Sequence, residues 1–438
     1  MRKELIKNLI TDFHESSVPV AKLRLLEIPV NSKKIIALTG VRRSGKTYQL
    51  YNVITRLIKQ KIKLRNILYF NFEDERIDKN SFILNNIIES YQELYPEINL
   101  GDCYFLFDEI QNINGWEKFT RRIYEQISKN IFITGSNSKL LSREISTSLR
   151  GRSINFEIFP LSFEEYLNFL DIEINLKSTK SVSAIINTFE KFLSSGGFPE
   201  LIWIDSEIKN KILQEYFNVM IFRDLIERYD IKQTAILKYF CKREIGNSSK
   251  EFSVNKIYNE IKSQGYKISK DTIYQFQNYI ESSYLAFFLP RYSPSIVKQE
   301  FSKKKAYSID TGLAVSIDAA FLKNKGSVLE NLVFLELIKS GKKITYYSNN
   351  FECDFLLIEN ERVCEAIQVC FDINDSDTKK REEKSLIYVC KEFELKRGLI
   401  LTMYDEQKYI LDGIDIEIMP VYKYILRKYN SSMKIPVN

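Results

Sequence analysis

The stretch of sequence that decides the fold is Lys33-Lys34-Ile35-Ile36-Ala37-Leu38-Thr39-Gly40-Val41-Arg42-Arg43-Ser44-Gly45-Lys46-Thr47. Residues 33–39 form a short, β-rich apolar run of the length expected for a buried parallel strand. A Gly-x-x-x-x-Gly-Lys-Thr spacing follows directly at residues 40–47, and a helical pattern continues to about residue 60. A strand, a glycine-rich turn and a helix in this order predict a loop that surrounds phosphate oxygens.

Each residue type in this turn has a chemical reason to be there. The glycines let backbone N–H groups turn toward a phosphate, and the helix N-terminus adds the positive end of its dipole. Lys46 is expected to reach the outer phosphates, and the Thr47 hydroxyl suits Mg²⁺. The sequence therefore predicts a P-loop (Walker A motif) that binds ATP with Mg²⁺, against the alternative of a chance glycine turn. The expected binding residues are Gly40, Val41, Arg42, Arg43, Ser44, Gly45, Lys46 and Thr47.

A second apolar run, Tyr104–Phe107, ends in two adjacent carboxylates, Asp108 and Glu109. About sixty residues after a P-loop this pattern is typical of a Walker B strand. Asp108 is expected to hold Mg²⁺, and Glu109 to accept a proton from the attacking water. The alternative is a solvated turn at a strand end.

A third apolar run, Ile131–Thr134, ends in small polar residues that include Ser136 and Asn137. Its place in the chain fits a sensor-type strand between the P-loop strand and the strand that ends in Glu109. Ser136 or Asn137 is then expected to bind the γ-phosphate or the water. The alternative is that these residues N-cap the next helix.

Arginines follow this segment. Phosphoryl transfer gains most from positive charge at the γ-phosphate, often supplied by a neighbouring subunit. Arg150 or Arg152 is the expected arginine finger, with Arg143 nearby, and ordinary surface arginine is the alternative. A finger supplied in this way predicts a homo-oligomer.

Composition excludes several kinds of active site. Lys and Arg number 64 and Asp and Glu 57, so the net charge of +7 permits an anionic partner without requiring one. The single histidine, His14, stands apart from every motif, which argues against a Ser-His-Asp triad or a histidine-rich zinc centre. The charged start of the chain lacks a signal-peptide pattern, and no apolar run approaches the roughly 20 residues that span a bilayer. We expect a cytoplasmic protein without membrane contact.

The middle of the chain changes pattern twice. Residues 161–230 read as helical, and residues 231–290 follow the helix, helix, turn, helix, strand order of a winged helix-turn-helix. This second segment carries nine Lys/Arg and five Asp/Glu, yet its expected recognition helix, Asp271–Ser283, contains no Lys or Arg. Duplex DNA and a protein are therefore alternative partners for this segment.

Several short motifs lie in order along the chain: Phe107–Asn112, Trp116–Lys118, Ile133–Ser136, Leu149–Arg152, Phe159–Phe163, Gly196–Pro199, Asp310–Leu313, Glu330–Leu337 and Glu352–Phe355. Together they resemble the AAA-type P-loop ATPases of bacteria and archaea, in the subgroup with an appended C-terminal domain of unknown function. The resemblance implies an α/β protein built around the parallel sheet of a P-loop NTPase. The implied domains are the ATPase core over 1–160, a helical lid over 161–230, a winged helix over 231–290 and a restriction-endonuclease-like α/β domain over 291–438.

The C-terminal domain departs from a working nuclease pattern. Restriction-type sites use a helix glutamate, a strand aspartate and a Glu/Gln-x-Lys motif, because the carboxylates hold Mg²⁺ and the lysine helps to activate water. The corresponding residues here are Glu330, Asp354 and Gln368, and Cys370 stands where the lysine belongs. We expect weak Mg²⁺ binding with little or no cleavage, and otherwise a fold retained for binding or assembly.

The leading hypothesis is an ATP-hydrolysing enzyme whose nucleotide state drives a DNA- or protein-binding module. One alternative is a nucleotide-dependent binding switch that hydrolyses slowly. The other is a metal-dependent nuclease gated by ATP.

Overall fold

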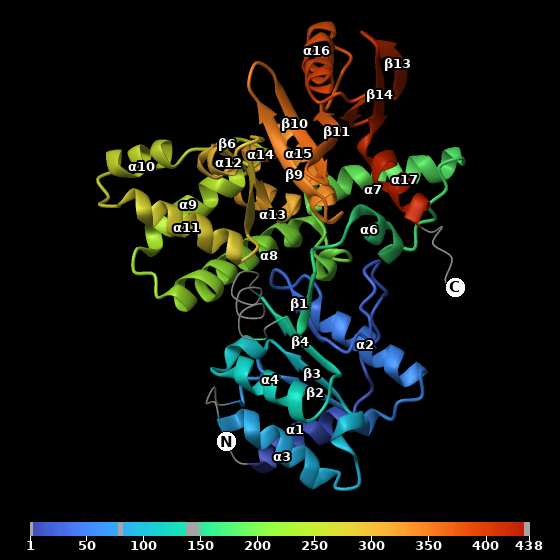
Figure 1. Cartoon of the computed structure of the whole chain (residues 1–438), viewed down its shortest axis with the longest axis vertical. Coiled ribbons are helices and arrows are strands. Elements are labelled where there is room, and N and C mark those ends of the chain that lie inside the picture. The colour runs from blue at the N-terminus through green and yellow to red at the C-terminus, as the bar shows by residue number, and fades with distance from the viewer. Residues whose placement is uncertain (1–2, 78–81, 137–148, 150, 433–438) are drawn as a thin grey trace. The chain divides into compact units, whose positions relative to one another are not determined.

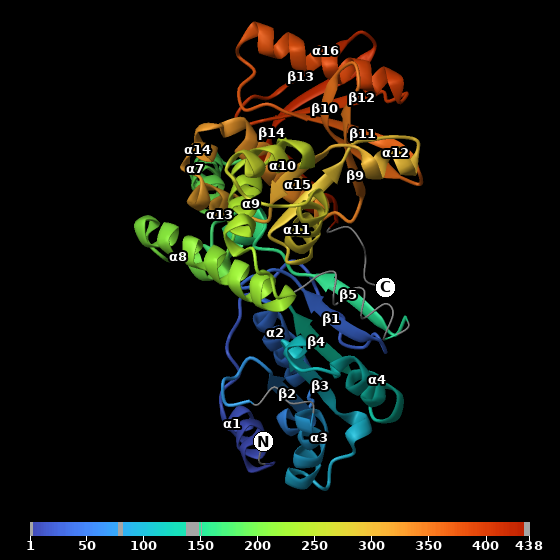
Figure 2. The same cartoon turned by 90° about the vertical axis from the view of Figure 1, so that its left-hand side faces the viewer.

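The computed structural model describes residues 3–77, 82–136, 149 and 151–432. The chain divides into two units, which Figures 1 and 2 show in one colour scheme from blue to red. The first unit comprises residues 1–159 with 282–284, and the second comprises 160–281 with 285–438. In the described part of the chain, no helix combines the length and the apolar character that crossing a membrane requires.

A five-stranded parallel sheet forms the centre of the first unit, with the strand order β2-β3-β4-β1-β5 (Figure 1). The strands are β1 (Ile35–Thr39), β2 (Ile67–Asn71), β3 (Tyr104–Asp108), β4 (Ile131–Gly135) and β5 (Ser153–Glu157). β4 pairs with both β1 and β3, which confirms the position predicted for the sensor-type strand. Because the strands are parallel, their carboxyl ends meet at one edge of the sheet, where ligands bind in open α/β folds.

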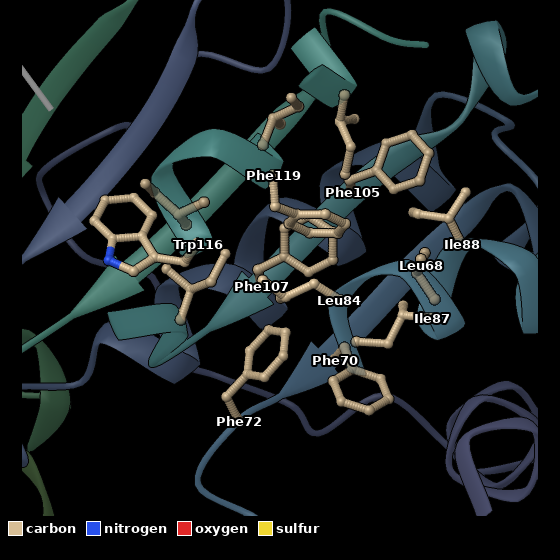
Figure 3. Close-up of a cluster of buried hydrophobic side chains, with 14 of the residues drawn as sticks. Leu68, Phe70, Phe72, Leu84, Ile87, Ile88, Phe105, Phe107, Trp116 and Phe119 are labelled. Atoms are coloured by element: carbon tan, nitrogen blue, oxygen red, sulfur yellow. The ribbon is translucent and has the colours of Figure 1, made fainter. Parts of the chain in front are cut away.

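Helices cover both faces of this sheet, because side chains alternate between the faces of a buried strand. The helices are α1 (Lys3–Glu15), α2 (Lys46–Lys59), α3 (Phe82–Leu94) and α4 (Trp116–Gln126), with short 3₁₀ turns at η1 (Leu64–Asn66), η2 (Leu100–Asp102) and η3 (Ile110–Asn112). On one face, Phe107 packs in a cluster with Trp116 and Phe119 of α4 (Figure 3). On the other face, Leu106 belongs to a cluster with Leu50 of α2. The sheet edge that carries the P-loop is thus supported from both sides.

Helices also open the second unit. They are α6 (Phe163–Phe169), α7 (Thr179–Ser195), η4 (Pro199–Leu201), α8 (Ser206–Val219) and the π-helix η5 (Met220–Glu227). The α6 helix begins with a capping box, in which Ser162 Oγ accepts from the Glu165 N–H and the Glu165 carboxylate accepts from the Ser162 N–H. The all-helical pattern predicted after residue 160 is therefore present.

A three-stranded antiparallel sheet with the order β6-β8-β7 follows these helices. In chain order the elements are α9 (Thr234–Gly246), β6 (Glu251–Phe252), α10 (Val254–Ser263), α11 (Lys270–Ser282), β7 (Ala286–Pro290), α12 (Ile296–Phe301) and β8 (Lys304–Ser308). The sequence places residues 306–309 with the C-terminal domain, but β8 pairs with β7 and completes this sheet. The boundary expected at residue 290 therefore divides two paired strands.

A six-stranded mixed sheet forms the last part of the second unit, in the order β13-β14-β12-β11-β10-β9. Its strands are β9 (Lys343–Ser348), β10 (Glu352–Glu359), β11 (Arg362–Val369), β12 (Arg397–Thr402), β13 (Gln407–Leu411) and β14 (Ile414–Pro420). The accompanying helices are α13 (Thr311–Ile317), α14 (Ala319–Lys323), α15 (Lys325–Ile338), α16 (Ser376–Glu392) and α17 (Val421–Ser432). Apolar runs in the sequence predict β9 to β12 but neither β13 nor β14; the residues of β13 are exposed or half-buried and so lack the pattern of a buried strand.

Glu164 on α6 supplies a pH-dependent test of this part of the fold. The residue is buried, and its Oε2 has no hydrogen-bond partner among the described residues. Burial, together with the nearby Glu165 and Glu336, raises the pKa of Glu164 to about 7. A carboxyl with a higher pKa in the folded chain than in the unfolded one costs stability as pH rises between those two values.

The Glu164→Gln protein should therefore be more stable than the wild type at pH 8, by about 1–3 kcal/mol. The gain should shrink toward pH 5, where the folded wild type carries a protonated Glu164. Thermal unfolding of both proteins at the two pH values measures this difference. An equal gain at both pH values would contradict the raised pKa.

Candidate nucleotide-binding site

The predicted P-loop joins the end of β1 to the start of α2 through residues 40–45. A Cβ on Gly40 would lie 2.1 Å from the Ile158 carbonyl oxygen, so no side chain fits there. Gly45 has φ 97°, a left-handed conformation that glycine adopts without strain. Arg43 has φ 63° and adopts the same left-handed region, which costs energy for a residue that has a side chain. These turns suit a loop whose N–H groups surround an anion.

Lys46 opens α2, and its side chain is only 4% exposed. The ammonium donates to the carbonyl oxygens of Gly40 and Val41, each at 3.1 Å, and lies 3.2 Å from Glu109 Oε1. In the same loop, Ser44 Oγ is buried without a hydrogen-bond partner among the described residues. A buried ammonium and an orphaned hydroxyl in one loop are the donors that a phosphate group requires. These residues therefore fit the phosphates of ATP.

Three hydroxyl groups converge on the Asp108 carboxylate at the end of β3. Thr47 Oγ1 donates to Oδ2 at 2.7 Å, and Tyr69 donates to the same oxygen at 3.0 Å. Thr134 Oγ1 donates to the other oxygen, Oδ1. Burial and the neighbouring Glu109 raise the pKa of Asp108, while the three hydroxyls oppose this rise. Because Mg²⁺ prefers oxygen ligands, the adjoining Thr47 hydroxyl and Asp108 carboxylate fit the magnesium of an ATP complex.

Glu109 occupies a left-handed turn directly after β3, with φ 50°. Its N–H donates to Thr134 Oγ1 at 2.8 Å, and Gln111 Nε2 donates to its Oε2. Burial alone would raise the pKa of Glu109, but Lys46 and Arg42 outweigh it and lower the pKa. The carboxylate is therefore held in its charged form beside the Lys46 ammonium, as a group that accepts a proton from water must be.

The end of β4 contributes Thr134 to the site, a residue that the sequence analysis does not name. Thr134 bonds to both Asp108 and Glu109, whereas the sequence points to the residues after it. Ser136 is buried beside the strand end, and Asn137 lies outside the described residues.

Sequence reasoning also missed Tyr69 and Thr134 as partners of Asp108. Tyr69 and Thr134 lie on β2 and β4, the two strands that flank β3. Hydroxyl residues on strands that neighbour the Asp108 strand are therefore the signal that could have identified these partners. Recognising that signal requires the strand order, which two separated apolar runs do not specify.

The arginines behave differently from the P-loop residues. Arg143 and Arg150 lie outside the described residues. The Arg152 carbonyl accepts from the Ile35 N–H at 2.9 Å, which places Arg152 at the amino end of β1, whereas the P-loop follows its carboxyl end. Its guanidinium lies 2.9 Å from Glu125 on α4. Because five strand residues span roughly 16 Å, Arg152 is remote from the P-loop of its own chain.

Arg24 was not predicted to take part in the site. It precedes β1, and its guanidinium donates to the carbonyl oxygens of Ser44 at 3.1 Å and Phe159 at 3.0 Å. Arg24 thus stabilises the P-loop backbone at Ser44. No local motif marks it, because its two acceptors are 20 and 135 residues away in the chain.

The residues of the predicted nuclease site come together in the second unit. Glu330 lies on α15, Asp354 on β10 and Gln368 on β11. The Asp354 N–H donates to Gln368 Oε1 at 3.2 Å, and Lys305 Nζ lies within 3.1 Å of both carboxylates. No sequence motif marks Lys305, which lies 25 residues before Glu330, on β8 of the three-stranded sheet. Across the described residues, no group of three or more His, Cys, Asp or Glu is arranged to hold a metal ion.

Comparison with known proteins places this geometry in a family. A family model described as an AAA domain matches residues 32–167, and one for a domain of unknown function (DUF8612) matches residues 186–324. An uncharacterized protein of Methanocaldococcus jannaschii is 37% identical over 97% of this chain and 96% of its own length. An uncharacterized protein of Haemophilus influenzae is 30% identical over 87% of this chain and 92% of its own length.

Solved structures also resemble the chain at low sequence identity. The Walker-type ATPase of Pyrococcus abyssi is 12% identical, with a TM-score of 0.41 over 72% of this chain and 95% of that chain. AMPPCP-bound DnaA from Aquifex aeolicus is 13% identical, with a TM-score of 0.24 over 64% of this chain and 86% of that chain. On the strength of the AAA match and the near full-length relatives, the chain is an AAA-domain protein of the P-loop type and belongs to the same family as the protein of Methanocaldococcus jannaschii.

Proposed function

We propose that this protein binds ATP with Mg²⁺ and hydrolyses it. The observation that carries the proposal is the pair of contacts at the sheet edge, Lys46 with Glu109 and Thr47 with Asp108. An ammonium, a hydroxyl and two carboxylates with separate partners are the groups that phosphoryl transfer to water requires.

We propose the following roles for the residues of this site when nucleotide binds. Lys46 exchanges the carbonyl oxygens of the loop for phosphate oxygens, and it then no longer needs Glu109 as its counter-charge. Glu109 is free to orient the attacking water and accept its proton. Thr47 and Asp108 would hold Mg²⁺, which would supply positive charge to the phosphates. Thr134 holds Asp108 and Glu109 at a constant spacing.

We further propose that the segment from α9 to β8 is a winged helix that binds duplex DNA. Its helix, strand, helix, helix, strand order from α9 to β7 supports this, as does the antiparallel β6-β8-β7 sheet, which β8 completes after the short helix α12. Lys256 on α10 and Lys267, three residues before α11, are exposed and therefore able to contact phosphates. The lack of Lys or Arg in α11 after Lys270 favours a protein as the alternative partner.

The steady-state ATPase rate, measured with and without duplex DNA, tests both proposals. We expect Mg²⁺-dependent hydrolysis that DNA changes several-fold, together with DNA binding that weakens as salt rises. The double change Lys256→Glu and Lys267→Glu should remove the DNA effect and keep the basal rate. Lys180→Glu on α7, also exposed, is the matched control. An ATPase rate that DNA does not change, together with no detectable DNA binding, would support the ATPase proposal and contradict the proposal of DNA as the partner.

A separate prediction concerns Arg152 as an arginine finger supplied by a neighbouring subunit. Because Arg152 is remote from its own P-loop, it acts on nucleotide only in a second copy of the chain. The specific ATPase activity should then rise with protein concentration, and Arg152→Ala should lower it about 10-fold or more. Concentration-independent activity in a protein shown to be a monomer would exclude this role.

A further inference from the structure

Lys305 lies at the centre of a buried charge cluster in the second unit. Its side chain is 4% exposed, and its Nζ lies 2.9 Å from Asp354 Oδ1 and 3.1 Å from Glu330 Oε1. A third carboxylate, that of Glu352, lies 3.0 Å away. The carboxylates belong to α15 and β10, whereas the lysine belongs to β8 of the three-stranded sheet.

The two inner carboxylates depend on this ammonium. The side chains of Glu330 and Asp354 are 12% and 11% exposed, and two carboxyl groups buried this close together resist being charged at the same time unless a cation lies between them. A divalent metal ion would satisfy the same oxygens, so the ammonium and the metal compete for one place.

The residues of the third nuclease motif supply no replacement for that cation. Gln368 accepts from the Asp354 N–H with its Oε1 and donates to Glu382 with its Nε2. Cys370 Sγ donates to the Asp372 carbonyl oxygen at 3.0 Å. The positive charge of the cluster therefore comes from a different strand than the motif predicts.

Further bonds join β8 to α15 beside the cluster. Tyr307 donates to Glu330 Oε1 at 2.7 Å, and its ring stacks on Phe334 with centroids 4.2 Å apart. The Ser308 N–H donates to Asn331 Oδ1 at 2.8 Å, and Asn331 Nδ2 donates back to the Ser308 carbonyl at 3.1 Å. β8 is the central strand of the three-stranded sheet, so these bonds attach that whole sheet to the C-terminal domain.

We propose that Lys305 is the resident cation of this cluster, that it occupies the place a divalent metal ion would take between Glu330 and Asp354, and that it fastens the three-stranded sheet to the C-terminal domain. The C-terminal domain is then a rigid support for the segment from α9 to β8, without nuclease chemistry of its own. Removing the ammonium should uncover a site for a divalent cation.

Binding of Mn²⁺, followed by the electron paramagnetic resonance of the free ion, tests this in nucleotide-free full-length protein. Lys305→Met should bind one more Mn²⁺ per chain than the wild type, and adding Asp354→Asn should remove that ion. Lys303→Met, a neighbouring lysine whose side chain is 64% exposed, is the matched control and should bind no additional ion. Lys305→Met that gains no Mn²⁺ and unfolds at the wild-type temperature would overturn the proposal.

Thermal unfolding gives a second readout. Lys305→Met should unfold several degrees below the wild type, and millimolar Mn²⁺ should restore part of the loss, because a ligand of the folded state stabilises it. Should Lys305→Met fail to fold, Mn²⁺ binding by the wild type and by Asp354→Asn decides. If the wild type and Asp354→Asn bind the same number of Mn²⁺ ions, Lys305 excludes the metal as proposed. If the wild type binds an Mn²⁺ ion that Asp354→Asn does not bind, the proposal is overturned.

Plasmid cleavage tests the absence of nuclease chemistry. Wild type and Asp354→Ala, each incubated with supercoiled plasmid, ATP and either Mg²⁺ or Mn²⁺, should both leave the plasmid intact. Robust cleavage that disappears in Asp354→Ala would show that a metal ion binds beside Lys305, and would overturn the proposal. This result does not depend on ATP hydrolysis by the first unit.

Discussion

The Glu109→Gln protein is expected to bind ATP as tightly as the wild type and to lose at least about 100-fold of its turnover rate, since loss of a general base costs about 10²–10⁴-fold. The amide is nearly the same size as the carboxylate, so the turn after β3 and the bond from its N–H to Thr134 persist. What is lost is the negative charge that accepts a proton from water. Removing that charge also frees Lys46 from its counter-ion, so nucleotide affinity should not fall.

Lys46→Ala, in contrast, should lose nucleotide binding itself. Its ammonium is the buried charged group of the P-loop and the one we propose to contact phosphate, so its loss should abolish ATP binding and, with it, hydrolysis. Fluorescent-nucleotide titration and steady-state turnover, measured on the same samples, separate the two variants. Glu75→Gln, an exposed glutamate after β2, controls for the loss of a carboxylate. Wild-type turnover in Glu109→Gln would remove Glu109 from its assigned role.

Local signals explain which parts of the nucleotide site were predictable. The P-loop occupies consecutive residues between a strand and a helix, and its spacing alone specifies the turn. Asp108 and Glu109 end an apolar run in the same local way. Arg24 and Tyr69 act through contacts with residues far along the chain, so no spacing marks them.

The second unit shows the same limit more sharply. The helices between residues 161 and 290, the helix α15 and the strands β9 to β12 follow from sequence patterns, and Glu330, Asp354 and Gln368 follow from motif order. Pairing between sheets depends on packing that no short pattern encodes. The sequence therefore did not predict that β8 pairs with β7, or that β8 carries Lys305 into the carboxylate cluster.

Gly312→Ala should strongly destabilise the second unit, by about 3 kcal/mol or more, which is the upper range for overpacking a buried site. The glycine opens α13, and a Cβ there would lie 2.4 Å from the carbonyl carbon and oxygen of Ser195, at the end of α7. These are backbone atoms, so no side chain is able to move aside. Two sequence motifs meet at this point, because Asp310 Oδ2 accepts from the Gly197 N–H at 2.7 Å.

Gly326→Ala supplies the matched control for this prediction. Gly326 also lies in the first turn of a helix, α15, but the nearest atom to its added Cβ would be Asn324 Oδ1 at an ordinary 3.7 Å. Alanine favours helix over glycine by up to about 1 kcal/mol, so Gly326→Ala should leave stability unchanged or raise it slightly. Gly312→Ala receives the same benefit and must still unfold several degrees lower in calorimetry. Equal unfolding temperatures for the two variants would mean that α13 moves away from α7 at little cost, and that the meeting of the two motifs at Asp310 is not a fixed contact of the fold.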